Sequence, residues 1–227
     1  MKTLFRIAAL ALVLAMSPLL KAETHYKPRV SIGGRAGVSM AEMSLSPSVK
    51  QSWNIASTGA VTFRYTEEKL FGFIAELGWV QRGWKENYEG LPFSYSRTLT
   101  YINLPFLTHI YFGSKRFKGF VNLGPQACYL IADNISANFD YHTPAAVDGY
   151  PANRMTEQLY TDVHNKFDYG ICAGLGGEFY VSPRNSFLLE ARFYYGLGNI
   201  FPAAKADTFS ASRSMSLEFT LGYFFKL

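Results

Sequence analysis

Apolar residues recur at every second position along almost the whole chain from Arg29 onward. In the segment 167–181, for example, Tyr169, Ile171 and Leu175 alternate with Gly170 and Gly174. A period of two residues is typical of a β-strand whose two faces meet different surroundings. The pattern predicts eight such strands, at Arg29–Ser39, Asn54–Tyr65, Leu70–Arg82, Thr98–Phe112, Gly119–Ile131, Phe167–Val181, Ser186–Leu197 and Arg213–Leu227.

The lengths of the strands and of their connections point to a membrane barrel. Each expected strand exceeds the ~5–6 residues usual in soluble sheets and suits a tilted membrane strand of ~9–11 residues. Short connections at Thr66–Lys69, Gly113–Lys118 and Ser182–Asn185 alternate with long ones at Met40–Trp53, Gly83–Arg97, Ala132–Lys166 and Gly198–Ser212. Outer-membrane barrels have short periplasmic turns and long extracellular loops. We therefore expect an eight-stranded antiparallel transmembrane up-and-down β-barrel.

A soluble eight-stranded barrel is the main alternative to this interpretation. Such a barrel is apolar inside and polar outside, and it has the same alternation, so parity alone does not choose between the two. The amino-terminal segment favours the membrane. Lys2 and Arg6 precede an apolar run, and Lys21-Ala22 offers a small residue at a cleavage point. This arrangement predicts a secretory signal peptide over residues 1–22, removed to leave a barrel domain over 23–227. An uncleaved anchor is the alternative.

Composition narrows the function classes further. The chain has 227 residues and a formal charge of +5, but much of that excess lies in the first 22 residues, which carry no acid. The remainder is close to neutral and gives no argument for nucleic-acid binding. Two cysteines are too few for a disulfide scaffold. Because none directly follows the expected cleavage point, a lipid-anchored lipoprotein is not expected.

Seven charged residues share the face that we expect to point into the barrel. An eight-stranded barrel is just wide enough for side chains to fill it, and a charge confined there is costly unless it is paired. We therefore predict a salt-bridge network that plugs the lumen, with Asn103, Asn122 and Gln126 completing its hydrogen bonds. A water-filled pore is the alternative. The network comprises Arg35, Arg64, Glu76, Glu178, Glu190, Arg192 and Glu218.

The last strand carries a pattern of its own. Thr220, Gly222, Phe225 and Leu227 follow the order of a polar residue, a glycine and terminal apolar residues. This order resembles the terminal insertion signal of bacterial outer-membrane proteins, which the barrel-assembly machinery reads. Leu227 stands where that signal usually has Phe.

Two further groups of residues leave alternatives open. Cys128 and Cys172 lie on neighbouring expected strands with the same inward parity, which allows a disulfide in an oxidising compartment or two free thiols that fill space. Trp53, Trp84 and Tyr95 lie in or beside the long loops, where they suit either an interfacial aromatic girdle or a binding surface. A second girdle would contain Tyr65, Tyr111, Phe112, Tyr180 and Tyr223.

Enzymatic chemistry has little support in the sequence. His142 lies near Asp140 and Asp148, and His164 lies between Asp162 and Asp168, so a His–Asp pair is the only hydrolytic arrangement to consider. No nucleophile, zinc or phosphate-loop motif appears, and metal-ligand spacing is absent. We expect no enzyme activity and no cofactor.

Several short segments carry a resemblance to a known family. They are Gly33–Val38, Phe73–Gly78, Thr100–Phe106, Val121–Pro125, Phe167–Gly170, Ala173–Gly176 and Arg192–Leu197. Over most of the chain after residue 22, these segments resemble the PorT-like outer-membrane β-barrel family of Bacteroidetes. That family usually has Glu where Asn103 stands.

The resemblance implies an integral outer-membrane barrel and, for PorT itself, an accessory role in type IX secretion with other secretion components as partners. That pathway exports surface proteases and adhesins. The alternative is a structural or surface-interaction barrel of the OmpA/OmpX kind, acting through its extracellular loops.

Overall fold

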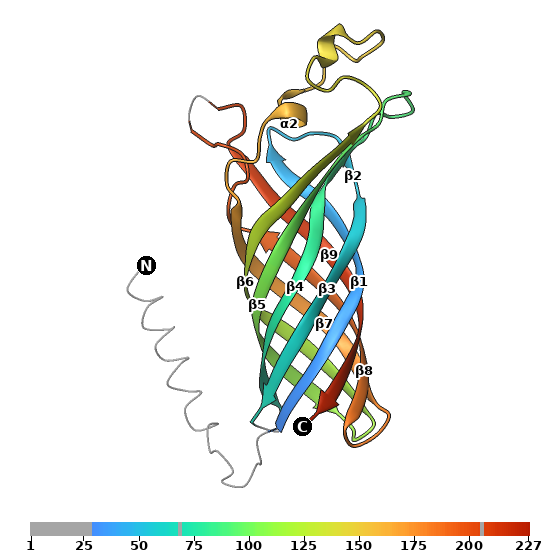
Figure 1. Cartoon of the computed structure of the whole chain (residues 1–227), viewed down its shortest axis with the longest axis vertical. Coiled ribbons are helices and arrows are strands. Elements are labelled where there is room, and N and C mark those ends of the chain that lie inside the picture. Colours follow the sequence, from blue (N-terminus) through green and yellow to red (C-terminus); the bar gives the residue numbers. More distant parts are fainter. Residues whose placement is uncertain (1–28, 68–69, 205–206) are drawn as a thin grey trace, which may run out of the picture.

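The computed structural model describes residues 29–67, 70–204 and 207–227, and it shows one closed barrel (Figure 1). The expected signal peptide lies outside these residues. Within them, no helix is both long enough and apolar enough to cross a membrane. Eight long strands form the wall, and a ninth, the two-residue β2 (Gln51–Ser52), extends the sheet beside β4. The long strands are β1 (Arg29–Ser46), β3 (Asn54–Thr66), β4 (Phe71–Glu86), β5 (Tyr95–Gly113), β6 (Phe117–Ala137), β7 (Phe167–Tyr180), β8 (Asn185–Gly196) and β9 (Ala211–Lys226).

Every long strand pairs with antiparallel neighbours on both sides. Strands that follow one another along the chain are neighbours, and β1 closes the ring by pairing with β9 from Ser31 opposite Lys226 to Ser46 opposite Ala211. Closure pairs the central part of each long strand on both sides, so the backbone hydrogen bonds there are satisfied within the wall. The predicted all-β barrel of eight antiparallel strands is therefore confirmed.

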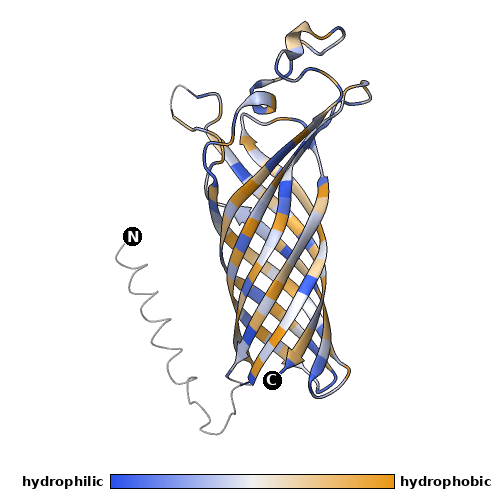
Figure 2. Cartoon of the chain, viewed as in Figure 1, coloured by the Kyte–Doolittle hydropathy of each residue, from blue (hydrophilic) through white to orange (hydrophobic). Residues whose placement is uncertain are grey.

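The alternation in the sequence separates an apolar outer face from a polar interior, and Figure 2 shows the two colours alternating along the strands. On β4, Leu77 is 60% exposed whereas the neighbouring Glu76 is 3% exposed. On β7, Leu175 is likewise 66% exposed, and the inward Glu178 is 1% exposed. Leu107 departs from the alternation: it points inward and is buried in the interior.

Several strands run further than the apolar pattern predicts, and the longest extensions lie toward the end of the long loops. β5 has 19 residues and β6 has 21, about twice the ~9–11 that cross a membrane. The additional residues of these strands are mostly small or polar on the outer face, so the apolar alternation in the sequence does not reveal them. We call this end of the barrel the loop end and the opposite end the turn end.

A β-bulge changes the inward parity of β6. Tyr101 pairs with Leu130, but the preceding Thr100 pairs with Ala132, so Ile131 is the extra residue. Below the bulge the even-numbered residues of β6 face inward, and above it the odd-numbered ones do. Asp133 is thereby placed on the same side of the wall as Arg97 of β5.

The expectation of two aromatic girdles is only partly correct. Trp53 is 47% exposed, but Trp84 and Tyr95 are fully buried inside the barrel because β4 and β5 continue to these positions with inward parity. At the turn end, Phe112 and Tyr223 are exposed on the outer face, whereas Tyr111 points inward.

Candidate functional site

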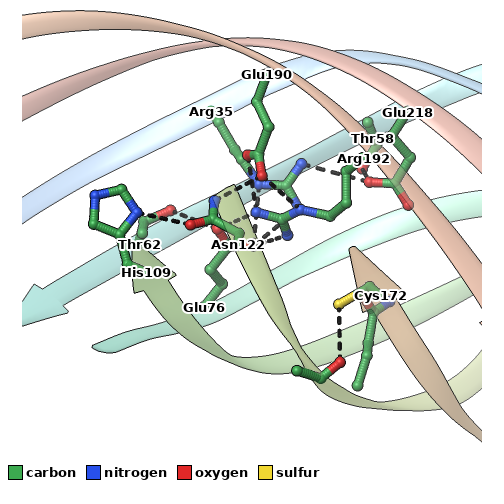
Figure 3. A network of polar contacts seen from close by, with 12 residues as sticks. Arg35, Thr58, Thr62, Glu76, His109, Asn122, Cys172, Glu190, Arg192 and Glu218 are labelled. Atoms are coloured by element: carbon green, nitrogen blue, oxygen red, sulfur yellow. Dashed lines mark hydrogen bonds and ion pairs between the residues drawn. The ribbon is translucent and has the colours of Figure 1, made fainter. Parts of the chain in front are cut away.

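The middle of the lumen is filled by a cluster of arginine and glutamate side chains, drawn in Figure 3. Arg192 is 1% exposed and contacts two carboxylates: its Nη1 lies 2.7 Å from Glu76 Oε2, and its Nη2 lies 2.9 Å from Glu190 Oε2. Arg35 binds the same Glu76 at 2.9 Å and approaches Glu218 at 3.5 Å. Five of the seven predicted lumen charges are therefore brought together in one connected cluster.

The cluster needs space that only glycine provides. Gly174 of β7 lies beside the carboxylate of Glu190, and a Cβ atom built there would come within 2.4 Å of Oε1. A side chain at this position would push Glu190 out of its contact with Arg192. The charges and the small residues of the inward face thus fit one another.

Two further charged residues of the same cluster are absent from the sequence prediction. Arg82 is completely buried, lies 3.5 Å from Glu218 and 4.0 Å from Asp168, and stacks 3.6 Å from the centre of the Tyr194 ring. The Tyr194 hydroxyl donates to Asp168 at 3.0 Å. Both charges could have been found by continuing the parity, since Arg82 shares its face with Glu76.

The remaining predicted pair stands apart, nearer the turn end. Arg64 donates to both carboxylate oxygens of Glu178, at 2.9 and 2.7 Å. The hydroxyls of Ser186 and Tyr180 complete the carboxylate at 2.5 and 3.1 Å. Glu178 is therefore fully hydrogen-bonded within the barrel.

Of the three amides expected to complete the network, only Asn122 bonds to one of its charged residues. Asn122 lies 2.7 Å from His109 Nδ1 and donates to Glu190 at 2.8 Å, which links the turn-end histidine to the central cluster. Gln126 donates to the Cys128 sulfur at 3.4 Å. Asn103 is buried without a hydrogen-bond partner among the described residues. It pairs across the wall with Gly78 and Cys128, which offer no strong polar group.

The disulfide considered for Cys128 and Cys172 is not formed: both cysteines are free thiols and both are buried. The register places Cys128 opposite Asp168 and Cys172 opposite Gly124, so the two cysteines are offset by four residues. That offset is ~13 Å along the strands, well beyond the reach of a disulfide. Shared inward parity is necessary for a bridge but does not fix the register.

Above the charge cluster the interior becomes apolar and aromatic. Trp84 packs edge-on against Phe201, with ring centres 5.9 Å apart, and both are buried. The short helix α2 (Glu157–Tyr160) in the loop between β6 and β7 lies over the opening, and its Leu159 is fully buried. The Tyr95 hydroxyl donates to the Leu159 carbonyl at 2.8 Å. The lumen is thus filled from the central charges to the loop end.

The helix α2 and the loop around it form a cap over the lumen, and polar contacts hold this cap against the wall. Arg97 is buried, donates to Asp133 at 2.6 Å and to the Thr161 carbonyl at 2.7 Å. Gln158 of α2 donates to the buried carboxylate of Glu86 at 3.1 Å. The strand extension and the bulge described above therefore position the residues that hold the longest loop.

The outer loops pack against one another as an ordered cluster of rings. Tyr88, Phe93, Phe139 and Tyr150 have ring centres 5.5 to 6.1 Å apart. We call these four residues the loop-end aromatic cluster. Burial raises the pKa of the Tyr88 and Tyr150 hydroxyls above the ordinary value for tyrosine. A cavity of about 490 Å³ beside the cluster is lined by charged residues that include Lys50 and Arg154.

Two of the aspartates considered as catalytic partners of His142 and His164 bond to groups other than the imidazole rings. Asp140 accepts from the Thr143 hydroxyl at 2.7 Å and from the backbone N–H of His142 at 3.0 Å, and these bonds hold its pKa below the usual range. Asp168 lies inside the lumen with Tyr194 rather than beside His164. Among the described residues, no group of three His, Cys, Asp or Glu side chains is placed to hold a metal ion.

The four residues of the expected insertion signal alternate between the faces of the wall. Thr220 and Gly222 of β9 are buried on the inward face, while Phe225 is 40% exposed and Leu227 is 69% exposed on the outer face. β9 is also the strand that closes the ring against β1.

Comparison with known proteins agrees with this architecture. The sequence profile of the outer membrane protein beta-barrel domain family matches residues 22–202. A search of curated proteins finds no match. Among solved structures, OprG from Pseudomonas aeruginosa is similar with a TM-score of 0.50, at 12% identity over 89% of this chain and 97% of OprG. Neisserial surface protein A has a TM-score of 0.46, at 14% identity over 87% of this chain and 97% of its own.

Proposed function

The chain belongs to the outer membrane protein beta-barrel domain family, and on that premise we propose that it is a closed, non-enzymatic barrel that acts at its ends. It is an integral protein of the outer membrane, surrounded by outer-membrane lipid. In such barrels the short turns face the periplasm and the long loops face outward. The finer question is which end makes the functional contact.

One observation carries the proposal: the described side chains at the centre of the lumen are packed together and buried. Glu76, Arg192 and Glu218 are each at most 3% exposed, and the cap of α2 covers the loop end. Ion pairs of this kind are costly to separate, because removing one partner leaves a buried charge. Opening a central pore would require several such separations at once.

The outer loops are the favoured place of action, as in a structural or surface-interaction barrel of the OmpA/OmpX kind. The loop-end aromatic cluster gives these loops a fixed shape, and long strands raise them beyond the membrane. A pre-formed surface loses less conformational entropy on binding than a mobile loop does. The adjoining cavity, about 490 Å³, falls within the range of ligand sites.

An accessory role in type IX secretion is the second candidate. Its support is the resemblance of segments such as Thr100–Phe106 and Arg192–Leu197 to the PorT-like family of Bacteroidetes. In that role the partners would be other components of the secretion system. Fold alone does not transfer such a role.

A complementation experiment separates the two. The gene is deleted and then restored either intact or with residues 139–151 replaced by a short Gly-Ser linker, and insertion is checked by heat-modifiability on gels. We expect the trimmed barrel to insert into the outer membrane but to fail to restore the attachment of intact cells to surfaces. Export of surface proteases should be the same in the deletion strain and in both restored strains. Loss of export in the deletion strain, restored by the trimmed barrel, would instead support the secretion role.

We also propose that the end of β9 acts as the insertion signal read by the barrel-assembly machinery. Phe225 and Leu227 present apolar side chains on the outer face, where a membrane-embedded partner can reach them. Replacing both with Asp should lower the amount of protein in the outer membrane. The matched control, Asp at the loop positions Pro92 and Leu91, should leave that amount unchanged.

A further inference from the structure

The turn end of the barrel contains a cavity that the closed-lumen proposal does not use. Its volume is about 480 Å³, and it opens at the end of the barrel opposite the loops. Five basic side chains around this opening form a group that we call the basic mouth. The basic mouth consists of Lys115, Arg116, Lys118, Arg184 and Lys226.

Three separate parts of the chain supply the basic mouth. The β5–β6 turn and the start of β6 contribute Lys115, Arg116 and Lys118, and the β7–β8 turn contributes Arg184. The end of β9 contributes Lys226. Charges from such distant parts of the sequence converge only because the barrel closes.

Aromatic rings hold part of this charge in place. The Lys118 ammonium lies 4.3 Å from the centre of the Tyr111 ring and 5.2 Å from that of Tyr180. On the floor of the cavity, the Arg64 guanidinium lies 4.3 Å from the centre of the Phe224 ring. Contacts of this kind fix a cation without neutralising it.

Among the described residues, no carboxylate lines the cavity. Glu67 follows the lining residue Thr66 but is exposed in the β3–β4 turn. Glu178 is the acid nearest the floor, and it is already engaged by both nitrogens of Arg64 and by two hydroxyls. The five cations of the basic mouth, gathered in one concave opening, therefore produce a positive potential that attracts anions.

Filling the barrel does not require these charges, since the central cluster balances its arginines with glutamates. Like charges held together destabilise a fold unless something binds them. We propose that the basic mouth is a binding site for a soluble periplasmic anion that carries at least two phosphate or carboxylate charges. Arg and Lys are the side chains best suited to such groups.

The position of the cavity favours a soluble anion over a lipid headgroup. Its floor is formed by inward residues of the strands, including Arg64, His109 and Ser186. The wall of the barrel separates that floor from the surrounding lipid. An anion that enters along the barrel axis reaches the floor directly, whereas a lipid would have to leave its leaflet.

Calorimetry on the full protein in nanodiscs of neutral phosphatidylcholine tests this site, with pyrophosphate and citrate as probes at low salt. We expect one probe molecule per barrel and an affinity that falls as salt rises. The variant Arg116→Gln/Arg184→Gln changes only exposed turn residues and should weaken binding severalfold. Lys118→Gln, which removes the cation held between two rings, should weaken it about tenfold.

The control matched to Lys118→Gln is Lys85→Gln, which removes one positive charge from an exposed residue near the loop end and should bind both probes like the wild type. Failure of the wild type to bind either probe would overturn the proposal, as would equal binding by the turn variant. Nanodiscs that contain phosphatidylglycerol identify the source: unchanged affinity supports a soluble anion, and abolished binding assigns the mouth to lipid headgroups instead. The outer-loop proposal stands or falls independently of these results.

Discussion

Replacing Arg192 with Met should destabilise the barrel by stranding one particular carboxylate. Arg192 donates four hydrogen bonds, two to Glu76 and two to Glu190. After the substitution Glu76 keeps Arg35, which donates to it at 2.9 and 3.0 Å. Glu190 keeps only the amide of Asn122 at 2.8 Å. Breaking a buried pair in this way costs ~3–5 kcal/mol.

A double-mutant cycle isolates the cause. Glu190→Gln alone leaves Arg192 paired with Glu76 and should cost ~1–2 kcal/mol. If the stranded charge is responsible, Arg192→Met/Glu190→Gln should be more stable than Arg192→Met by ~2 kcal/mol, although it carries one substitution more. Arg184→Met, an exposed arginine of the β7–β8 turn, is the control and should change stability by less than ~0.5 kcal/mol.

Reversible urea unfolding in phosphatidylcholine vesicles provides the measurement, followed by the fluorescence of the three tryptophans. Trp84 of β4 is buried inside the barrel, above the central charge cluster, so its fluorescence reports on this part of the lumen. The reasoning is refuted if Arg192→Met costs less than ~1 kcal/mol, or if the double variant is as unstable as that single one. Either result would mean that water or rearranged side chains neutralise Glu190.

Three other predictions follow from the faces and contents of the wall. Arg at Leu104 or Leu175 should cost ~2–4 kcal/mol if the position lies near the bilayer midplane, whereas Arg at the loop residue Leu91 should be tolerated in the same unfolding assay; equal costs would mean that the assigned faces are wrong. The purified protein should give almost no steady current in planar bilayers, and a large ohmic conductance would contradict the filled lumen. Cys128 and Cys172 should react with maleimide only after unfolding, with no shift on reducing gels; labelling of the folded barrel would show that the interior is open.

The sequence predicts the barrel well because successive residues of a strand alternate between its two faces, and this period of two is visible directly in the amino-acid sequence. The outer face stands out through residues such as Leu77 and Leu175, and the inward charges stand out by contrast. Arg82 and Asp168 follow the same rule, since each shares its parity with a charge on its own strand, Glu76 and Glu178 respectively.

Other features depend on information that parity does not contain. Which charges meet across the lumen depends on strand stagger, and the same stagger keeps Cys128 away from Cys172. The bulge at Ile131 changes which residues of β6 point inward, and the sequence has no glycine at this position that would indicate a bulge. The ends of β4 and β5 were missed because their outer face turns polar where the wall leaves the membrane.

The pairing of β1 with β9 has a consequence for how the barrel is made. Ser31 meets Lys226 across the whole length of the folded chain, and closing a loop of that size costs about 5 kcal/mol of chain entropy before any contact repays it. Structures dominated by such distant contacts fold slowly. Until the final strand arrives, every partial sheet has two open edges and an outer face of exposed leucine and phenylalanine. The chain is therefore most prone to aggregation between its synthesis and the closure of the barrel. A chaperone that covers the open edges and the apolar face would reduce this aggregation more than a substitution that stabilises the closed barrel.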